Sequence, residues 1–140
     1  MAAACGWCFG FGFHLAGLYW IGNAFLVEAD RFAWAMPFAV TLMPAGLAVF
    51  HALALAVASV VPGSPVARAI GLALALAATE WLRGTILTGF PWNTPGYAVD
   101  SLSIITQLAS GTGIFGVTFF VLLWGSAPAA LADDGSEDRQ

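Results

Sequence analysis

Two long uncharged stretches limit what this chain can fold into. Residues 6–27 contain no Asp, Glu, Lys or Arg over 22 positions, and residues 32–61 contain none over 30. A helix needs about 20 apolar residues to cross the hydrocarbon core of a bilayer. Only 9% of the residues are charged, against about 25% in an average soluble domain. The sequence therefore predicts a protein that lies in a membrane.

The uncharged stretches predict four membrane helices, at about residues 6–27, 38–61, 67–87 and 102–124. The second starts late because the run at 32–61 is too long for one untilted crossing and has Pro37 and Pro44 in its first half. We expect an all-α polytopic integral membrane bundle of about four transmembrane helices over residues 1–132. Residues 133–140 form an acidic tail that we expect to be disordered.

Charge excludes one class of partner and leaves the topology open. The chain has no lysine and no cluster of arginines, so we expect no nucleic-acid partner. Four spans place both termini on one side, with Arg68 and Arg139 there and Arg31 and Arg83 on the other. The positive-inside rule therefore gives a tie.

Residues 80–97, EWLRGTILTGFPWNTPGY, form the most unusual segment of the chain. Glu80 and Arg83 are three residues apart, so they share a helix face and can form an ion pair. An ionisable residue in or beside a membrane span indicates function by default. Two interpretations stay open: an ion pair at a helix end, or a polar anchor that fixes the following loop. Two prolines and two glycines within residues 89–96 predict that loop.

The aromatic residues of this loop also allow two interpretations. Phe90, Trp92 and Tyr97 fit an aromatic belt at the membrane–water interface. Alternatively, Trp92 is held by Pro91 and Pro95 and lines an entrance for an acyl chain or a lipid headgroup.

Neither the histidines nor the cysteines predict a metal or redox site. His14 and His51 lie on different predicted helices without Cys, Asp or Glu at metal-ligand spacing, so we expect no metal and a hydrogen-bonding role within the bundle. Cys5 and Cys8 form a C-x-x-C in an apolar run with no βαβ pattern, so we expect them to be packing residues. We expect no cofactor.

Two glycine patterns predict close helix contacts. Gly6 and Gly10 form a G-x-x-x-G step that lets a second helix approach. Residues 111–116, GTGIFG, match the dinucleotide-binding fingerprint, but residues 117–124 have no polar face of the kind a crossover helix needs. Helix packing in the membrane is the better interpretation of that segment.

The blocks E-W-L-R-G at residues 80–84 and G-F-P-W-N at 89–93 resemble those of the apolipoprotein N-acyltransferases of Gram-negative bacteria. Residues 10–13 and 17–21 are similar to an early segment of the same family, and the likeness spans about residues 6–123. The resemblance implies a multi-pass protein of the cell inner membrane. It also implies transfer of an acyl chain from phospholipid to the N-terminal diacylglyceryl-cysteine of a lipoprotein.

In this family the chemistry resides in a periplasmic nitrilase-like domain with a Glu–Lys–Cys triad. These 140 residues have no lysine, and Cys5 and Cys8 align with a membrane segment, so the resemblance assigns no catalytic residue here. We therefore expect a membrane-domain fragment that is inactive alone. Its expected partner is membrane phospholipid, and an apolipoprotein substrate would be met only through the missing domain.

The resemblance does carry over a loop motif, whose members here are Glu80, Arg83, Phe90, Pro91 and Trp92. In the family this loop faces the periplasm beside the active-site mouth, which makes these residues candidates for a substrate- or lipid-facing loop. The alternative is a non-catalytic membrane scaffold or lipid-binding module.

Overall fold

The computed structural model describes residues 1–99 and 103–137. Within these ranges the chain is helical and contains no strand. Three segments are long and apolar enough to cross a membrane: Ala29–Ala58, Pro65–Thr85 and Gln107–Ala132. The prediction of an all-α helical membrane bundle is confirmed.

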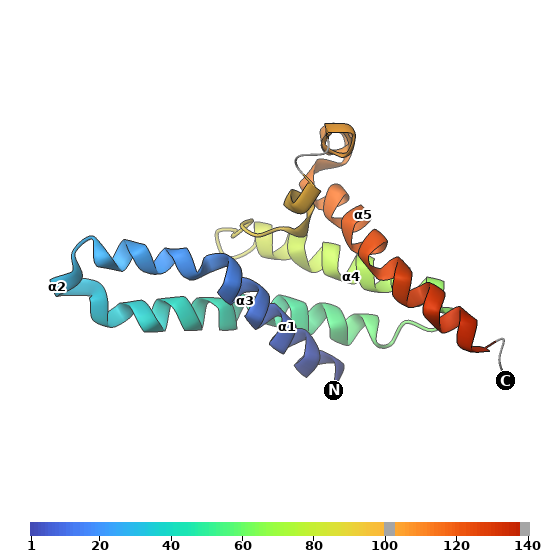
Figure 1. Ribbon diagram of the computed structural model, residues 1–140, viewed down its shortest axis with the longest axis horizontal. Coiled ribbons are helices and arrows are strands. Elements are labelled where there is room, and N and C mark those ends of the chain that lie inside the picture. The colour runs from blue at the N-terminus through green and yellow to red at the C-terminus, as the bar shows by residue number, and fades with distance from the viewer. Residues whose placement is uncertain (100–102, 138–140) are drawn as a thin grey trace.

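The N-terminal half is a long hairpin of helices (Figure 1). Its first arm is α1 (Ala2–Leu18) continued by the 3-10 helix η1 (Tyr19–Leu26), and its second arm is α3 (Met36–Ala58). Two short helices, α2 (Ala29–Phe32) and η2 (Ala33–Ala35), make the turn between them. The 17 residues of α1 rise about 26 Å at about 1.5 Å each, less than the roughly 30 Å hydrocarbon core, and the span predicted at residues 6–27 is not among the three long apolar segments.

Close contact between α1 and α3 depends on two glycines. A β carbon on Gly10 would lie 2.8 Å from the β carbon of His51, and one on Gly6 would lie 2.5 Å from the His51 carbonyl oxygen. Any larger residue would push the helices apart. The close approach predicted from Gly6-x-x-x-Gly10 is confirmed.

Two prolines lie in the first turn of a helix, and a third lies inside one. Pro37 lies in the first turn of α3, where its missing N–H group is not needed, so α3 begins before the predicted residue 38. Pro44 lies inside α3 and is buried. Pro65 begins α4 (Pro65–Thr85), where the Ser64 side chain caps the helix by accepting from the Ala67 N–H at 3.3 Å.

Helix α5 (Ser103–Glu137) lies against α4 and bends at Gly113, which has φ 67° and ψ 177°. Figure 1 shows the short part before the bend almost end-on above the longer part. A β carbon on Gly111 or Gly113 would meet nothing within 4 Å, so the packing role predicted for residues 111–116 is wrong at these two positions. Gly113 instead supplies the positive φ that the bend requires.

The two ends of α5 fall near predicted boundaries. The helix is described as far as Glu137 and so covers the first part of the tail predicted to be disordered. Residues 138–140 of that tail, and residue 102 at the predicted start of the fourth span, lie outside the described residues.

Candidate functional site

A buried ion pair lies near the C-terminal end of α4. The side chains of Glu80 and Arg83 are each 1–2% exposed. Arg83 Nε donates to Glu80 Oε1 at 3.3 Å, and Arg83 Nη2 donates to Glu80 Oε2. The pair predicted from the i, i+3 spacing is confirmed, and it lies inside the bundle.

Arg83 also holds the loop that follows α4. Its Nη1 donates to the carbonyl oxygen of Phe90 and, at 2.9 Å, to that of Trp92. One guanidinium therefore satisfies a carboxylate and two loop carbonyls. The sequence left two interpretations open, an ion pair at a helix end and a polar anchor for the following loop. In the structure the Glu80–Arg83 pair is both. We call residues 86–94 the anchored loop.

The anchored loop adopts backbone angles that an unsupported chain would avoid. Leu87, Thr88 and Asn93 have φ values of 53°, 74° and 58°. Positive φ is uncommon for residues other than glycine and costs free energy unless the surroundings compensate. Gly89, with φ 77°, lies so close to α4 that a β carbon would be 2.5 Å from the Gly84 carbonyl oxygen. The Arg83 hydrogen bonds are part of that compensation.

The loop also joins helices that are far apart in sequence. Asn93 packs directly on Gly17 at the end of α1, where a β carbon would collide with the amide. The Trp92 ring lies 5.5 Å from the Trp20 ring, centroid to centroid. Just beyond the loop, the Gly96 N–H donates to Thr118 Oγ1 of α5 at 3.1 Å. The loop region therefore contacts α1, η1, α4 and α5.

The five motif residues divide into an inner and an outer group. Glu80 and Arg83 are buried, whereas Pro91 and Trp92 are exposed and Phe90 is half-buried. The inner pair can fix the loop but cannot meet a ligand at the protein surface. The Trp92 side chain is 55% exposed and lies at the protein surface.

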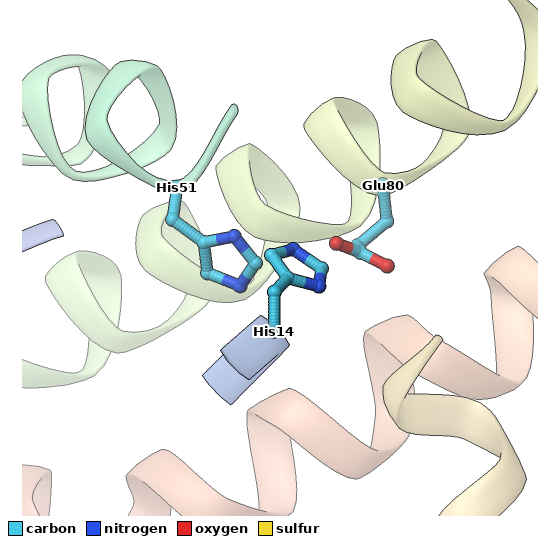
Figure 2. A group of neighbouring side chains, drawn as sticks. All are labelled: His14, His51 and Glu80. Carbon is cyan, nitrogen blue, oxygen red and sulfur yellow. The ribbon is translucent and has the colours of Figure 1, made fainter. Parts of the chain in front are cut away.

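The structure adds two residues that the sequence did not place at this site. His14 of α1 and His51 of α3 lie beside Glu80, and one donor atom from each residue lies within 4.8 Å of the other two (Figure 2). Both His14 nitrogens and His51 Nδ1 are buried without a hydrogen-bond partner among the described residues. The prediction that each histidine hydrogen-bonds within the bundle is therefore wrong for these atoms.

One signal in the sequence points to a part of this arrangement, the contact of His14 with a second helix. Gly6, Gly10 and His14 recur every four residues, which puts them on one face of α1. The two glycines admit α3, and His14 is then the next residue to meet it. The cysteines do not belong to the site: Cys5 and Cys8 are exposed free thiols, so their predicted packing role is wrong within this chain.

Fold and site together define a helical membrane protein in which a buried Glu–Arg pair anchors a loop rich in aromatics and prolines. The family model of the apolipoprotein N-acyltransferase N-terminal domain matches residues 1–127. The chain belongs to the apolipoprotein N-acyltransferase family.

Curated relatives agree over nearly the whole chain. An apolipoprotein N-acyltransferase of Rhodopseudomonas palustris is 47% identical over 139 residues, which are 99% of this chain and 26% of that protein. One of Sinorhizobium fredii is 48% identical over 130 residues, or 93% of this chain and 24% of the relative. The chain thus spans about a quarter of the length of these relatives. No solved structure matches it.

Proposed function

We propose that this chain is the membrane part of an apolipoprotein N-acyltransferase of the cell inner membrane. The complete enzyme would transfer an acyl chain from a phospholipid to the N-terminal diacylglyceryl-cysteine of lipoproteins. The observation that carries the proposal is the family match over residues 1–127, which includes the whole anchored loop. The relatives bear the name of this activity.

The proposal gives the inner and outer groups of the loop different tasks. Glu80 and Arg83 position the loop through the ion pair and the two carbonyl contacts. Phe90, Pro91 and Trp92 present the surface that meets the acyl donor or the substrate. No residue of this chain is assigned a covalent step.

Acyl transfer through a thioester needs a nucleophilic thiolate with an adjacent base. These 140 residues contain no lysine, and both cysteines lie on α1. We therefore expect the chain alone to be inactive. The test is complementation of a bacterial strain depleted of its own N-acyltransferase, with a full-length relative as the positive control. Growth rescued by these 140 residues alone would refute this part of the proposal.

The task given to the outer group is tested by two tryptophans in a complete enzyme that carries this segment. Trp92 and Trp34 are both exposed, at 55% and 72%, but only Trp92 belongs to the loop. Trp92→Ala should lower the rate of acyl transfer by about tenfold or more, because misplacing a substrate by about 1 Å can cost about a hundredfold. Trp34→Ala should leave the rate within about twofold of wild type. Equal losses at equal membrane abundance would make Trp92 an interface residue only.

A lipid-binding module without chemistry is the second candidate, and one observation favours it. An apolar groove of about 510 Å³ runs between α4 and α5, and its lining includes Val66, Phe120 and Trp124. Such a groove can hold an acyl chain. A phospholipid with a photoreactive acyl chain should label the groove in either case, whereas rescue of acyl transfer by adding the nitrilase-like domain in trans would occur only for the enzyme part.

A further inference from the structure

Three helices bring together two histidines that the proposed function does not use and a glutamate that it uses only as the partner of Arg83. His14 comes from α1, His51 from α3 and Glu80 from α4. Figure 2 shows the His14 ring between the His51 ring and the Glu80 carboxylate. Their exposures are 0%, 3% and 1%. The group is therefore enclosed by the bundle.

The two histidines lack partners that buried imidazoles normally have. Among the described residues, His14 Nδ1, His14 Nε2 and His51 Nδ1 have none. Leaving a buried donor or acceptor unpaired costs free energy, and such groups are few in native structures. Three in one place indicate that something binds there.

The chemistry of the donors indicates what binds. Two histidines and one glutamate form the protein ligand set of open zinc sites, which keep a fourth position for a small ligand. Bonds of about 2.0–2.1 Å put tetrahedral zinc ligands about 3.3 Å apart. Since the donor atoms already lie within 4.8 Å of one another, the side chains need to close by at most about 1.5 Å. We propose that His14, His51 and Glu80 bind a divalent transition-metal ion of the zinc type.

The surroundings hold these donors in position. A carboxylate has about four lone-pair sites, so Glu80 can accept both Arg83 hydrogen bonds and still bind a metal. Such outer partners fix the orientation of a ligand. The Phe13 ring contacts both imidazoles, at 5.2 Å from His14 and 5.7 Å from His51 between centroids. Because Glu80 and Arg83 cancel in charge, an anion from solution suits the fourth position.

The spacing along the sequence did not predict this site, since the donors lie 37 and 66 residues from His14. The close approach of α1 to α3 at Gly10 is what brings His14 to His51. The proposal stands independently of acyl transfer.

The test uses the 140-residue chain in lipid nanodiscs, purified without a histidine tag. Cys5→Ser and Cys8→Ser are introduced first, because the exposed C-x-x-C could bind zinc by itself. Zn²⁺ binding is measured by calorimetry, and X-ray absorption identifies the ligands. His14 and His51 are the only histidines of the chain, so any imidazole signal comes from them. We expect one Zn²⁺ per chain with two imidazole ligands.

Variants then assign the donors. His14→Gln and His51→Gln should each weaken binding by more than about a hundredfold, since loss of an outer partner alone costs about 10–100-fold. Glu80→Gln should weaken it as well, while Glu28→Gln, at an exposed carboxylate, should not. Helix content by circular dichroism shows that each variant is folded. Absence of saturable binding, or binding with no imidazole signal, would overturn the proposal and leave the site to buried water.

Discussion

Arg83 and His14 are both fully buried polar side chains of the same bundle, and their surroundings differ completely. Arg83 donates to both oxygens of Glu80 and to the carbonyls of Phe90 and Trp92. His14, with both ring nitrogens buried, has no hydrogen-bond partner in the part of the chain that the structure describes. The first arrangement stabilises the fold because each Arg83 side-chain nitrogen and both Glu80 oxygens have a hydrogen-bond partner. The second arrangement lowers the stability of the fold, because the buried ring nitrogens are unpaired. Such a group indicates that a ligand binds there.

This comparison predicts that removal of Arg83, the side chain with hydrogen-bond partners, lowers the free energy of unfolding the most. Arg83→Ala leaves Glu80 as an unpaired buried carboxylate and frees the anchored loop. Breaking a buried ion pair from one side costs about 3–5 kcal/mol. We expect a loss of this size in the free energy of unfolding, measured by titration with sodium dodecyl sulphate from mixed micelles and followed by circular dichroism.

Arg31→Ala is the matched control for this substitution. Arg31 is exposed and lies over the Phe32 ring at 5.2 Å. A cation–π contact at an exposed site contributes about 0.5–1 kcal/mol, so Arg31→Ala should cost no more than that. If the two variants were equally stable, the anchor would contribute nothing to the fold, and the contrast with His14 would fail.

A smaller loss of stability is expected from Gly10→Ala, at the contact between α1 and α3 that brings His14 to His51. Gly10→Ala places a β carbon 2.8 Å from the His51 β carbon and 3.1 Å from the Ala48 α carbon, so the two helices have to separate. Overpacking of this kind costs about 1–3 kcal/mol. The free energy of unfolding measures the effect, and bound Zn²⁺ should be lost with it.

Gly12 lies on the same helix, and a β carbon there would meet nothing within 4 Å, so Gly12→Ala is the control. Replacing a helical glycine by alanine at an open position should stabilise α1 by up to about 1 kcal/mol. We therefore expect Gly10→Ala to lower the free energy of unfolding and Gly12→Ala to raise it. Destabilisation by Gly12→Ala as large as that by Gly10→Ala would mean that α1 does not pack on α3 through the Gly10 face.

The same contrast explains what the sequence could predict. Partners of Arg83 lie three, seven and nine residues away, so the ion pair and the loop follow from local spacing and from the prolines and glycines. The G-x-x-x-G step predicted that a helix would approach α1, but it did not identify α3. The His14–His51–Glu80 group depends on how three helices pack, and no local pattern contains that information. The bend at Gly113 was missed because a glycine in an apolar helix is equally consistent with packing.

Replacement of His14, the side chain without hydrogen-bond partners, should lower the free energy of unfolding the least. His14→Leu replaces a buried imidazole without partners by an apolar side chain that can occupy the same site. Because the desolvation cost of the imidazole disappears, we expect the free energy of unfolding to stay within about 1 kcal/mol of wild type in the presence of a chelator, or to rise. When Cys5→Ser and Cys8→Ser are also present, saturating Zn²⁺ should then stabilise the chain that keeps His14 and leave His14→Leu unchanged, because a ligand that binds only the folded state stabilises it by mass action.

Thr118→Val is the matched control, since Thr118 is also fully buried but has its partners. Its hydroxyl donates to the Ile114 carbonyl at 2.9 Å and accepts from the Gly96 N–H at 3.1 Å. Valine keeps the shape and leaves the Gly96 N–H unpaired, which should cost about 1–3 kcal/mol. Burial is the same at both positions, so the difference between the variants isolates the effect of having a partner. A loss in His14→Leu as large as that in Thr118→Val, with the chelator present, would mean that the imidazole already stabilises the metal-free fold.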